Sequence, residues 1–170
     1  MTDFSLPALY AALDAQRQTR GLSWAQVARE INRRPEGRSG RRGVSPSTVS
    51  GMRTKTVAEG DGVLQMLRWL NRTPESFVPG HSELDSISAR LPDVPLHKVL
   101  RFDAKKLHSA LDAQRIERQM TWAQVAREIG VPPSSLPYLA RGTRTGFPQV
   151  MRIVRWLDRP AAEFTRLCDR

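Results

Sequence analysis

One eight-residue segment occurs twice in the chain, and this repeat limits the possible folds more than any other feature. Residues 24–31 and 122–129 both read WAQVAREI, at an offset of 98 residues. The segment LDAQR at residues 13–17 returns at the same offset at residues 111–115. An identity of this length does not arise by chance. We therefore expect two copies of one small domain, each with the same kind of role.

Positive charge belongs to both copies. The 170 residues carry a net charge of +10. Residues 1–77 hold 12 Lys/Arg and 7 Asp/Glu, residues 102–170 hold the same numbers, and residues 78–101 hold 3 of each. We assign residues 1–77 to the first domain, 78–101 to a linker and 102–170 to the second domain. Two basic domains suit a polyanionic partner such as nucleic acid, and a basic surface without a partner is the alternative.

The remaining composition argues against several classes of protein. Cys168 is the only cysteine, which excludes an intramolecular disulfide and fits a reducing cytoplasm, with association to the nucleoid. No apolar run approaches the roughly 18–20 residues that span a bilayer, and no signal-peptide pattern opens the sequence. The histidines, His81, His97 and His108, are scattered without metal-ligand spacing. Paired carboxylates, a nucleophile–base set and a phosphate-binding glycine loop are missing too, so we expect no enzyme, cofactor or metal.

Hydrophobic spacing predicts short helices in both copies. N-caps and capping boxes mark the starts of the first two helices: Ser5, Asp103, Ser23 with Gln26, and Thr121 with Gln124. These helices are expected to end near Thr19 and Arg118, and at Ile31 and Ile129. Apolar residues predict a fourth helix around residues 63–70 and 150–157 and a short fifth helix at Phe77 and Phe164. Strand-like alternation is not evident, so the prediction is an all-α fold with about five short helices in each domain.

The second copy contains a compact turn between its second and third helices. Gly130 supplies a left-handed turn and Val131 fills the core. A third short helix follows, with Leu136 and Leu139 facing inward, and it ends at Gly142. This pattern resembles the helix-turn-helix of the lambda-repressor/Cro (XRE) family, and with the flanking helices the resemblance covers most of both copies. It implies two tandem domains of that fold in a bacterial or phage transcriptional repressor, with the third helix in the DNA major groove.

The resemblance places two unlike segments at the major groove, with Val49 and Met52 as the core residues of the first. The candidate recognition-helix residues are Ser45, Pro46, Ser47, Ser50 and Gly51 in the first copy and Pro133, Ser134, Ser135 and Tyr138 in the second. None is the Gln, Asn or Arg that makes bidentate base contacts, so direct readout should be modest. Tyr138 is expected either at a thymine methyl or phosphate or packed against the second helix. Because the two helices differ, we expect an asymmetric site without a palindrome.

The first copy carries 11 additional residues between its second and third helices, because the repeat offset falls to 87 where RWL occurs at residues 68–70 and 155–157. This insertion, at about residues 33–43, contains no apolar residue and cannot fold alone. Its arginines are Arg33, Arg34, Arg38, Arg41 and Arg42. Our hypothesis is that they contact flanking phosphates or enter a minor groove, as basic arms do. A solvated insertion is the alternative, because long loops cost little.

Further contacts to the DNA backbone are expected around the third helices. The resemblance implies phosphate contacts from the loops that follow them, through Arg53, Lys55, Arg141 and Arg144. Trp24 and Trp122 begin the second helices, and their indole N–H groups are candidate phosphate donors unless the rings pack against the first helix. Structural roles are expected for the remaining pairs: Trp69 and Trp156 in the core, and Arg29 and Arg127 paired with Asp14 and Asp112.

The linker is apolar enough to hold the copies in a fixed relation. We expect a short helix over residues 82–91 and packing of Leu96, Val99 and Leu100. An extended linker can also span one turn of DNA, about 34–36 Å. The sequence therefore predicts a monomer that stands in for a repressor dimer, with a homodimer as the alternative.

The function predicted from the sequence is specific binding to double-stranded DNA, with repression by occupancy. Two other classes stay open at this point. One is an antitoxin or adaptor that binds a protein, and the other is an architectural or recombination accessory factor that bends DNA.

Overall fold

The computed structural model describes residues 3–32, 43–80 and 87–169, and within these ranges the fold is mostly helical, as predicted. The first repeat (residues 1–77) contains α1 (Leu6–Thr19), α2 (Trp24–Asn32), α3 (Pro46–Ser50), η1 (Gly51–Arg53), α4 (Gly60–Leu70) and η2 (Pro74–Phe77). The second repeat (residues 102–170) contains α5 (Ala104–Glu117), α6 (Trp122–Ile129), α7 (Ser135–Tyr138), η4 (Leu139–Arg141), α8 (Phe147–Leu157) and η5 (Ala161–Phe164). The elements follow the same order in both repeats.

Polar side chains begin the paired helices at the predicted positions. Ser5 accepts a backbone N–H of the first turn of α1 at 3.2 Å, and Asp103 does the same for α5 at 3.0 Å. Thr121 and Gln124 form a complete capping box, since each side chain bonds to the backbone of the other. Gly130 ends α6 in the left-handed conformation, with a φ of +79°. These features depend on neighbouring residues only, and the sequence prediction of each is confirmed.

A pair of strands contradicts the expectation that the chain contains none. β1 (Lys98–Phe102) pairs antiparallel with β2 (Thr165–Asp169), with Leu100 opposite Leu167. In β1 only Leu100 is fully buried, so the segment lacks the alternation from which a strand is usually recognised. The two strands also lie at opposite ends of the second repeat, and local sequence gives no sign of such a distant partner.

The predicted linker helix is not found where the chain is described. Residues 87–91 form a turn and an extended segment, whereas residues 82–86 of that prediction lie outside the described residues. Val94 and Leu100 are buried, but Leu96 is 71 % exposed, so only part of the predicted packing is observed.

β1 connects the linker to α4 of the first repeat. The Gln65 side chain donates to the Leu100 carbonyl at 2.8 Å. The Asp61 carboxylate accepts the Phe102 backbone N–H at 3.1 Å. The chain entering the second repeat is therefore held by the first repeat.

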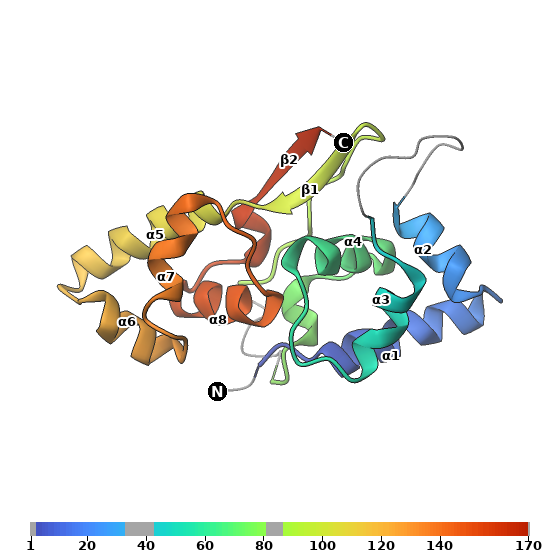
Figure 1. The fold of residues 1–170 in the computed structure, drawn as a ribbon, viewed down its shortest axis with the longest axis horizontal. Coiled ribbons are helices and arrows are strands. Elements are labelled where there is room, and N and C mark those ends of the chain that lie inside the picture. The colour runs from blue at the N-terminus through green and yellow to red at the C-terminus, as the bar shows by residue number, and fades with distance from the viewer. Residues whose placement is uncertain (1–2, 33–42, 81–86, 170) are drawn as a thin grey trace.

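A local twofold axis relates the two repeats. The segments that precede α4 and α8 lie antiparallel, with Glu59 opposite Gly146, its equivalent at the offset of 87. Two backbone hydrogen bonds flank this pair, and each is the equivalent of the other when every residue is replaced by its counterpart in the other repeat. These bonds are Gly60 N–H to the Thr145 carbonyl, 3.1 Å, and Phe147 N–H to the Ala58 carbonyl, 2.8 Å. In Figure 1 a half-turn about the line of sight exchanges α1 with α5, α2 with α6 and α4 with α8. Such a contact resembles the self-complementary interface of a homodimer.

The repeats share an apolar core at this axis. The Phe147 ring lies between those of Phe4 and Phe102, with ring centroids 4.5 and 5.4 Å away. Phe4 and Phe102 are equivalent residues of the two repeats. The equivalent of Phe147 is Gly60, where a Cβ atom would lie only 2.7 Å from the Phe102 ring. One phenylalanine therefore fills a position near the axis that has no room for a second large side chain.

Candidate nucleic-acid interface

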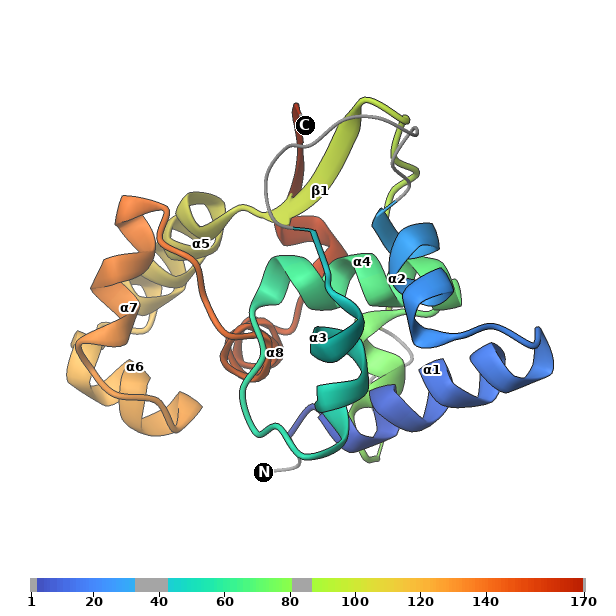
Figure 2. The same cartoon turned by 45° about the vertical axis from the view of Figure 1, so that its right-hand side comes forward.

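α3 and α7 lie on the same face of the molecule, on either side of the axis (Figures 1 and 2). Each is anchored by two inward apolar side chains, as the sequence predicted. Val49 and Met52 anchor α3 and η1 at 0 and 2 % exposure, and Leu136 and Leu139 anchor α7 and η4 at 0 and 1 %. With these side chains buried, the opposite side of each short helix remains available to a partner.

The side chains of α3 that the sequence assigned to the groove fall into two groups. Pro46 and Ser47 are exposed, whereas Ser45, Ser50 and Gly51 are partly buried. Ser45 is the N-cap, because its hydroxyl oxygen accepts a backbone N–H of the first turn at 3.0 Å. It also lies 2.9 Å from the Ser47 hydroxyl. Ser45 therefore positions α3, and Ser47 presents an exposed hydroxyl beside it.

α7 presents a different surface. Pro133, Ser134 and Tyr138 are exposed, and half of the Tyr138 surface is accessible. The Ser135 hydroxyl donates to the carbonyl three residues earlier at 2.7 Å. The Arg141 guanidinium lies 4.9 Å from the centre of the Tyr138 ring. An exposed cation–π pair thus occupies the place where the first repeat has Gly51 at the start of η1 and Thr54 just after it.

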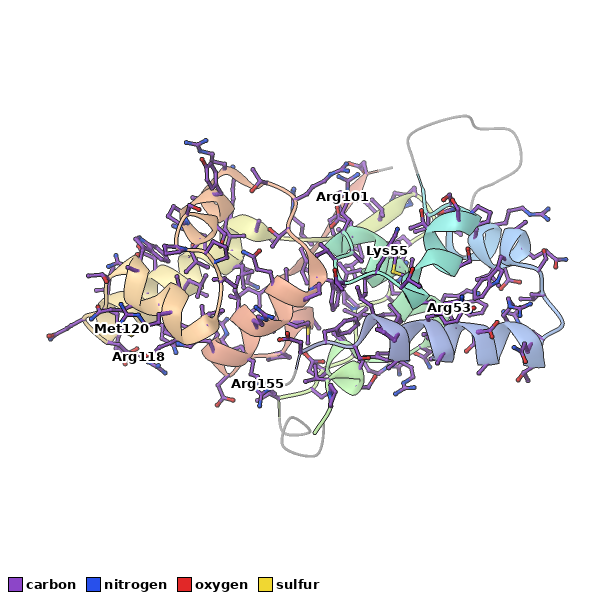
Figure 3. All side chains as sticks on the ribbon, turned by 60° about the horizontal axis from the view of Figure 1, so that its bottom comes forward. Arg53, Lys55, Arg101, Arg118, Met120 and Arg155 are labelled. Carbon is purple, nitrogen blue, oxygen red and sulfur yellow. The ribbon has the colours of Figure 1, made fainter. Side chains whose placement is uncertain are left out.

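Basic residues follow both short helices. Arg53, Lys55 and Arg141 are exposed, and Figure 3 shows Arg53 and Lys55 near α3, far from Arg118 at the other end of the molecule. Arg144 forms an ion pair with Glu59 at 2.9 Å, although its side chain is 69 % exposed. This pair joins the repeats beside the axis, so Arg144 has a structural partner in addition to its predicted phosphate.

The two residues that flank the insertion are held together at the start of α3. The Asn32 side chain accepts the Val44 N–H and donates to the Val44 carbonyl, both at 2.8 Å. Val44 is the equivalent of Val131 and is buried at 8 % exposure. The predicted contacts Arg33, Arg34, Arg38, Arg41 and Arg42 lie outside the described residues.

Trp24 and Trp122 lie against the first helix of their repeats. The Trp24 ring stacks on Tyr10 at 5.6 Å, and the Arg17 guanidinium lies 4.8 Å from its centre. The Trp122 ring stacks in the same way on His108 at 5.2 Å. Both tryptophans are partly buried. The packing interpretation therefore holds for the rings, and the phosphate contact of their N–H groups stays a prediction.

The acidic partners of the arginines differ from the sequence prediction. Asp14 bonds to Arg17 of its own helix at 2.7 Å, and Asp112 bonds to Arg115 at 2.6 Å. The predicted pairs of these aspartates with Arg29 and Arg127 are therefore wrong. An arginine three residues along the same helix lies next to the aspartate, so it pairs with that carboxylate in preference to an arginine of the second helix. Arg29 and Arg127 are exposed.

Trp69 and Trp156 are only partly buried, and each donates its indole N–H to a glutamate of the second helix. Trp69 donates to Glu30 at 2.9 Å, and Trp156 donates to Glu128 at 2.7 Å. The Arg20 guanidinium, followed by the Trp69 N–H, holds the pKa of Glu30 below its ordinary value. These contacts fix α2 against α4 and α6 against α8.

Two contacts between the repeats were missed at the sequence level. The buried Glu75 carboxylate of η2 accepts the Ala161 N–H at 2.8 Å. The Arg152 side chain of α8 bonds to Asp3 at 2.7 Å and to the Gly130 carbonyl at 2.7 Å. The only available signal was the difference between the copies, because neither Glu75 nor Arg152 is repeated at its equivalent position.

Within the described residues, acidic, histidine and cysteine side chains form no group that could hold a metal ion. Over the same residues, no helix combines the length and apolar character needed to cross a membrane. No protein-family model matches the chain, and neither a curated protein nor a solved structure matches it.

Proposed function

We propose that the chain binds double-stranded DNA in a sequence-specific manner and acts as a transcriptional repressor by occupying its site. The observation that carries this proposal is the position of α3 and α7, which lie at equivalent places of two basic repeats on one face about a twofold axis. Duplex DNA has twofold symmetry of its own. A protein with this symmetry can present one helix to each of two successive major grooves. Tandem domains of the lambda-repressor/Cro type are part of the proposal.

Different residues make the contacts to the bases and the contacts to the phosphates. Ser47 of α3, Ser134 just before α7 and Tyr138 of α7 are exposed and reach base edges or the thymine methyl group. Arg53, Lys55 and Arg141 lie beside these helices and neutralise phosphates, which adds affinity without sequence information. The chain needs no second copy of itself, because both reading helices belong to one molecule.

The twofold axis also determines the relative orientation of the two DNA half-sites. Repeats related by a translation along the DNA would read a direct repeat, whereas repeats related by a twofold axis read half-sites in opposite directions. Since α3 and α7 carry different side chains, the two half-sites have different sequences. The proposed site is thus inverted in orientation and unlike in sequence, which refines the expectation of a site without a palindrome.

Selection of bound sites from random DNA tests the proposal. The expected result is two unlike half-sites in opposite orientation, centred about 10 base pairs apart, one turn of DNA. Tyr138→Ala should change the preference in one half-site only, and Ser47→Ala should change the other. An absence of any enriched sequence would contradict specific binding, and enrichment of a direct repeat would contradict the proposed symmetry.

Deletion of residues 33–43 tests the arginine-rich insertion. The deletion places Asn32 directly before Val44 and reproduces the Gly130–Val131 turn of the second repeat, with asparagine at the left-handed position that it tolerates better than most residues. The variant should therefore fold. Each lost phosphate contact should flatten the dependence of log K on log salt by about 0.9. A slope equal to that of the parent chain would assign the insertion a solvated role.

The other functional classes are outcomes of the same measurements. Binding that disappears at moderate salt, with no sequence preference but with bent DNA, would indicate an architectural factor. The lack of bidentate base-reading side chains on α3 and α7 favours this class as the second candidate. A stable protein partner without any DNA binding would indicate an adaptor.

A further inference from the structure

A polar cavity lies between the end of α4 and the linker, outside the proposed DNA surface. Its volume is about 400 Å³, within the range of small-molecule sites. The lining residues are Leu67, Arg68, Asn71, Arg72, Arg90, Leu91, Pro92, Asp93 and Val94. None of them belongs to α3, α7 or the loops beside them. Among the residues that the structure describes, three arginines and one aspartate line this space.

Two of these arginines are oriented by the fold. The Arg72 guanidinium lies 4.4 Å from the centre of the Phe77 ring, and the Arg90 side chain donates to the Asn71 side-chain oxygen at 2.8 Å. Within the part of the chain that is described, no carboxylate pairs with Arg72 or Arg90. A guanidinium has five N–H donors, so both side chains retain donors for a ligand.

The second repeat shows which chemistry the same arginine prefers. Arg159 is the equivalent of Arg72 and lies in the same way on Phe164, with its guanidinium 4.9 Å from the ring centre. It forms a bidentate pair with Glu163, with both contacts at 2.8 Å. This pairing raises the pKa of Arg159 and lowers that of Glu163. In the first repeat the equivalent of Glu163 is Ser76, and the nearest contact of Arg72 is the Ser76 carbonyl at 3.5 Å.

A second carboxylate is missing at the same place. Asp158 caps α8 in the left-handed conformation, and its equivalent at the end of α4 is Asn71. The first repeat has therefore lost two acidic groups beside its stacked arginine while keeping the arginine. It has also gained Arg90 from the linker. The partial negative charge at the helix C-terminus, about half an elementary charge, and the single charge of Asp93 are together smaller than the two positive charges of Arg72 and Arg90.

We propose that this cavity binds a small anion through phosphate or carboxylate oxygens, with Arg72 and Arg90 as its principal ligands. The anion supplies to Arg72 the kind of oxygen pair that the Glu163 carboxylate supplies to Arg159. Planar oxygen pairs match the guanidinium fork and form charge-assisted hydrogen bonds with it. Because Arg90 and Asp93 belong to the segment that leads into β1, a bound anion joins α4 to the linker and serves as a regulatory ligand.

The test is calorimetric titration of the full chain, without DNA, with inorganic phosphate and separately with succinate at constant ionic strength. Binding of either anion with a Kd below about 1 mM supports the proposal, and the preferred anion identifies the ligand class. Failure of both overturns it. Since no DNA is present, the result is independent of the proposed repressor function.

A matched pair of variants locates the site. Ser76→Glu restores the carboxylate found in the second repeat, so it should occupy Arg72 and weaken anion binding by about tenfold or more. Ala113→Glu adds the same charge on the exposed side of α5 and should change the affinity by less than about twofold. Equal affinity of Ser76→Glu and the parent chain, or an equal loss in both variants, would overturn the assignment. Unfolding curves of both variants verify that the fold is retained.

Discussion

The two repeats are nearly identical in how their helices are held and differ where they meet. Gln16 donates to the Trp69 carbonyl and Gln114 to the Trp156 carbonyl, both at 3.2 Å. At the axis, by contrast, Phe147 packs against Phe4 and Phe102, whereas its equivalent Gly60 has no room for a Cβ atom beside Phe102. A homodimer must place two copies of each residue about its axis. A single chain can place one large and one small residue there, and the comparison shows that this chain has done so.

The equivalent residues Arg152 and Gln65 also form different kinds of hydrogen bond on the two sides of the axis. On one side of the axis, Arg152 of α8 bonds to the carboxylate of Asp3. On the other side, Gln65, the equivalent of Arg152, bonds to a backbone carbonyl of β1. Equivalent positions therefore hold neighbouring segments in place through charged groups on one side of the axis and through neutral groups on the other. Single substitutions at positions where the repeats differ measure how much each contact contributes to stability.

The largest effect is expected for Phe147→Ala. The substitution opens a cavity between Phe4 and Phe102, and it should lower the free energy of unfolding by about 3–5 kcal/mol. Equilibrium unfolding in urea measures the change. Val57→Ala is the control, because Val57 is 67 % exposed and should change the stability by less than about 0.5 kcal/mol. Similar losses in both variants would contradict a shared core at the axis.

Gly60→Ala should have the next largest effect. Its Cβ atom would lie 2.7 Å from Phe102 and 3.0 Å from the Thr145 carbonyl oxygen, so we expect a loss of about 1–3 kcal/mol. Gly62→Ala is a matched control in the same helix, since its nearest contact would be 3.9 Å away. That change should be neutral or stabilising, because alanine favours a helix by about 1 kcal/mol over glycine. Adding Phe102→Leu should recover part of the Gly60→Ala loss, and a strictly additive double variant would refute the steric explanation.

Asp3→Asn tests the charged tie between the repeats through its pH dependence. The side-chain hydrogen bond from Arg152 lowers the pKa of Asp3 from its ordinary value of 3.8. A lowered carboxyl pKa stabilises the fold above the unfolded-state value, and this contribution is lost as the pH falls through the folded-state value. Because the two side chains are 33 and 40 % exposed, the expected loss at pH 7 is at most about 1 kcal/mol.

The difference in stability between Asp3→Asn and the parent chain should shrink as the pH falls below 3.8. Chemical unfolding at several pH values measures it. Glu117→Gln removes a carboxylate from the exposed end of α5 and serves as the control for charge alone. A difference that stays constant down to the acid limit would exclude an ionic role for Asp3.

The smallest effect compares the glutamates of α2 and α6. Arg20 bonds to Glu30 at 2.6 and 2.9 Å, whereas Arg118 lies 3.9 Å from Glu128. Glu30→Gln should therefore destabilise the fold more than Glu128→Gln, by up to about 0.5 kcal/mol at low salt. Added salt should reduce this difference. Paired unfolding curves measure it, and a larger loss for Glu128→Gln would reverse the ranking.

Features set by neighbouring residues could be predicted from the sequence. The capping box at Thr121, the left-handed Gly130 and the inward side of α7 each follow from a few adjacent residues. The same locality explains the error at Asp14, because its partner Arg17 lies on the same helix and the predicted Arg29 does not. Contacts between distant segments could not be predicted, as the β1–β2 pair and the Phe147 packing show.

For the candidate interface, the sequence indicated some of the exposed side chains, although Ser45, Ser50, Gly51 and Ser135 are partly buried, and it did not indicate how the two reading helices are related. Ser47, Ser134 and Tyr138 are exposed as expected. The twofold relation depends on contacts between distant segments, among them the backbone pairing of Glu59 with Gly146, and neither of these residues is distinctive in the sequence. The repeat alone was equally compatible with a translation along the chain.

The pairing of β1 with β2 has a consequence for how the chain is made. Ribosomes synthesise β1 at the start of the second repeat and β2 at its end, so β1 lacks its partner until that repeat has emerged. Phe147, which fills the space beside Phe4, also appears late. During synthesis the first repeat therefore exposes an apolar surface until the second repeat has been made. Chaperones bind nascent chains that expose such surfaces. Slowing translation after the linker should lengthen this exposure, and the yield of folded protein would then depend on the speed of the ribosome.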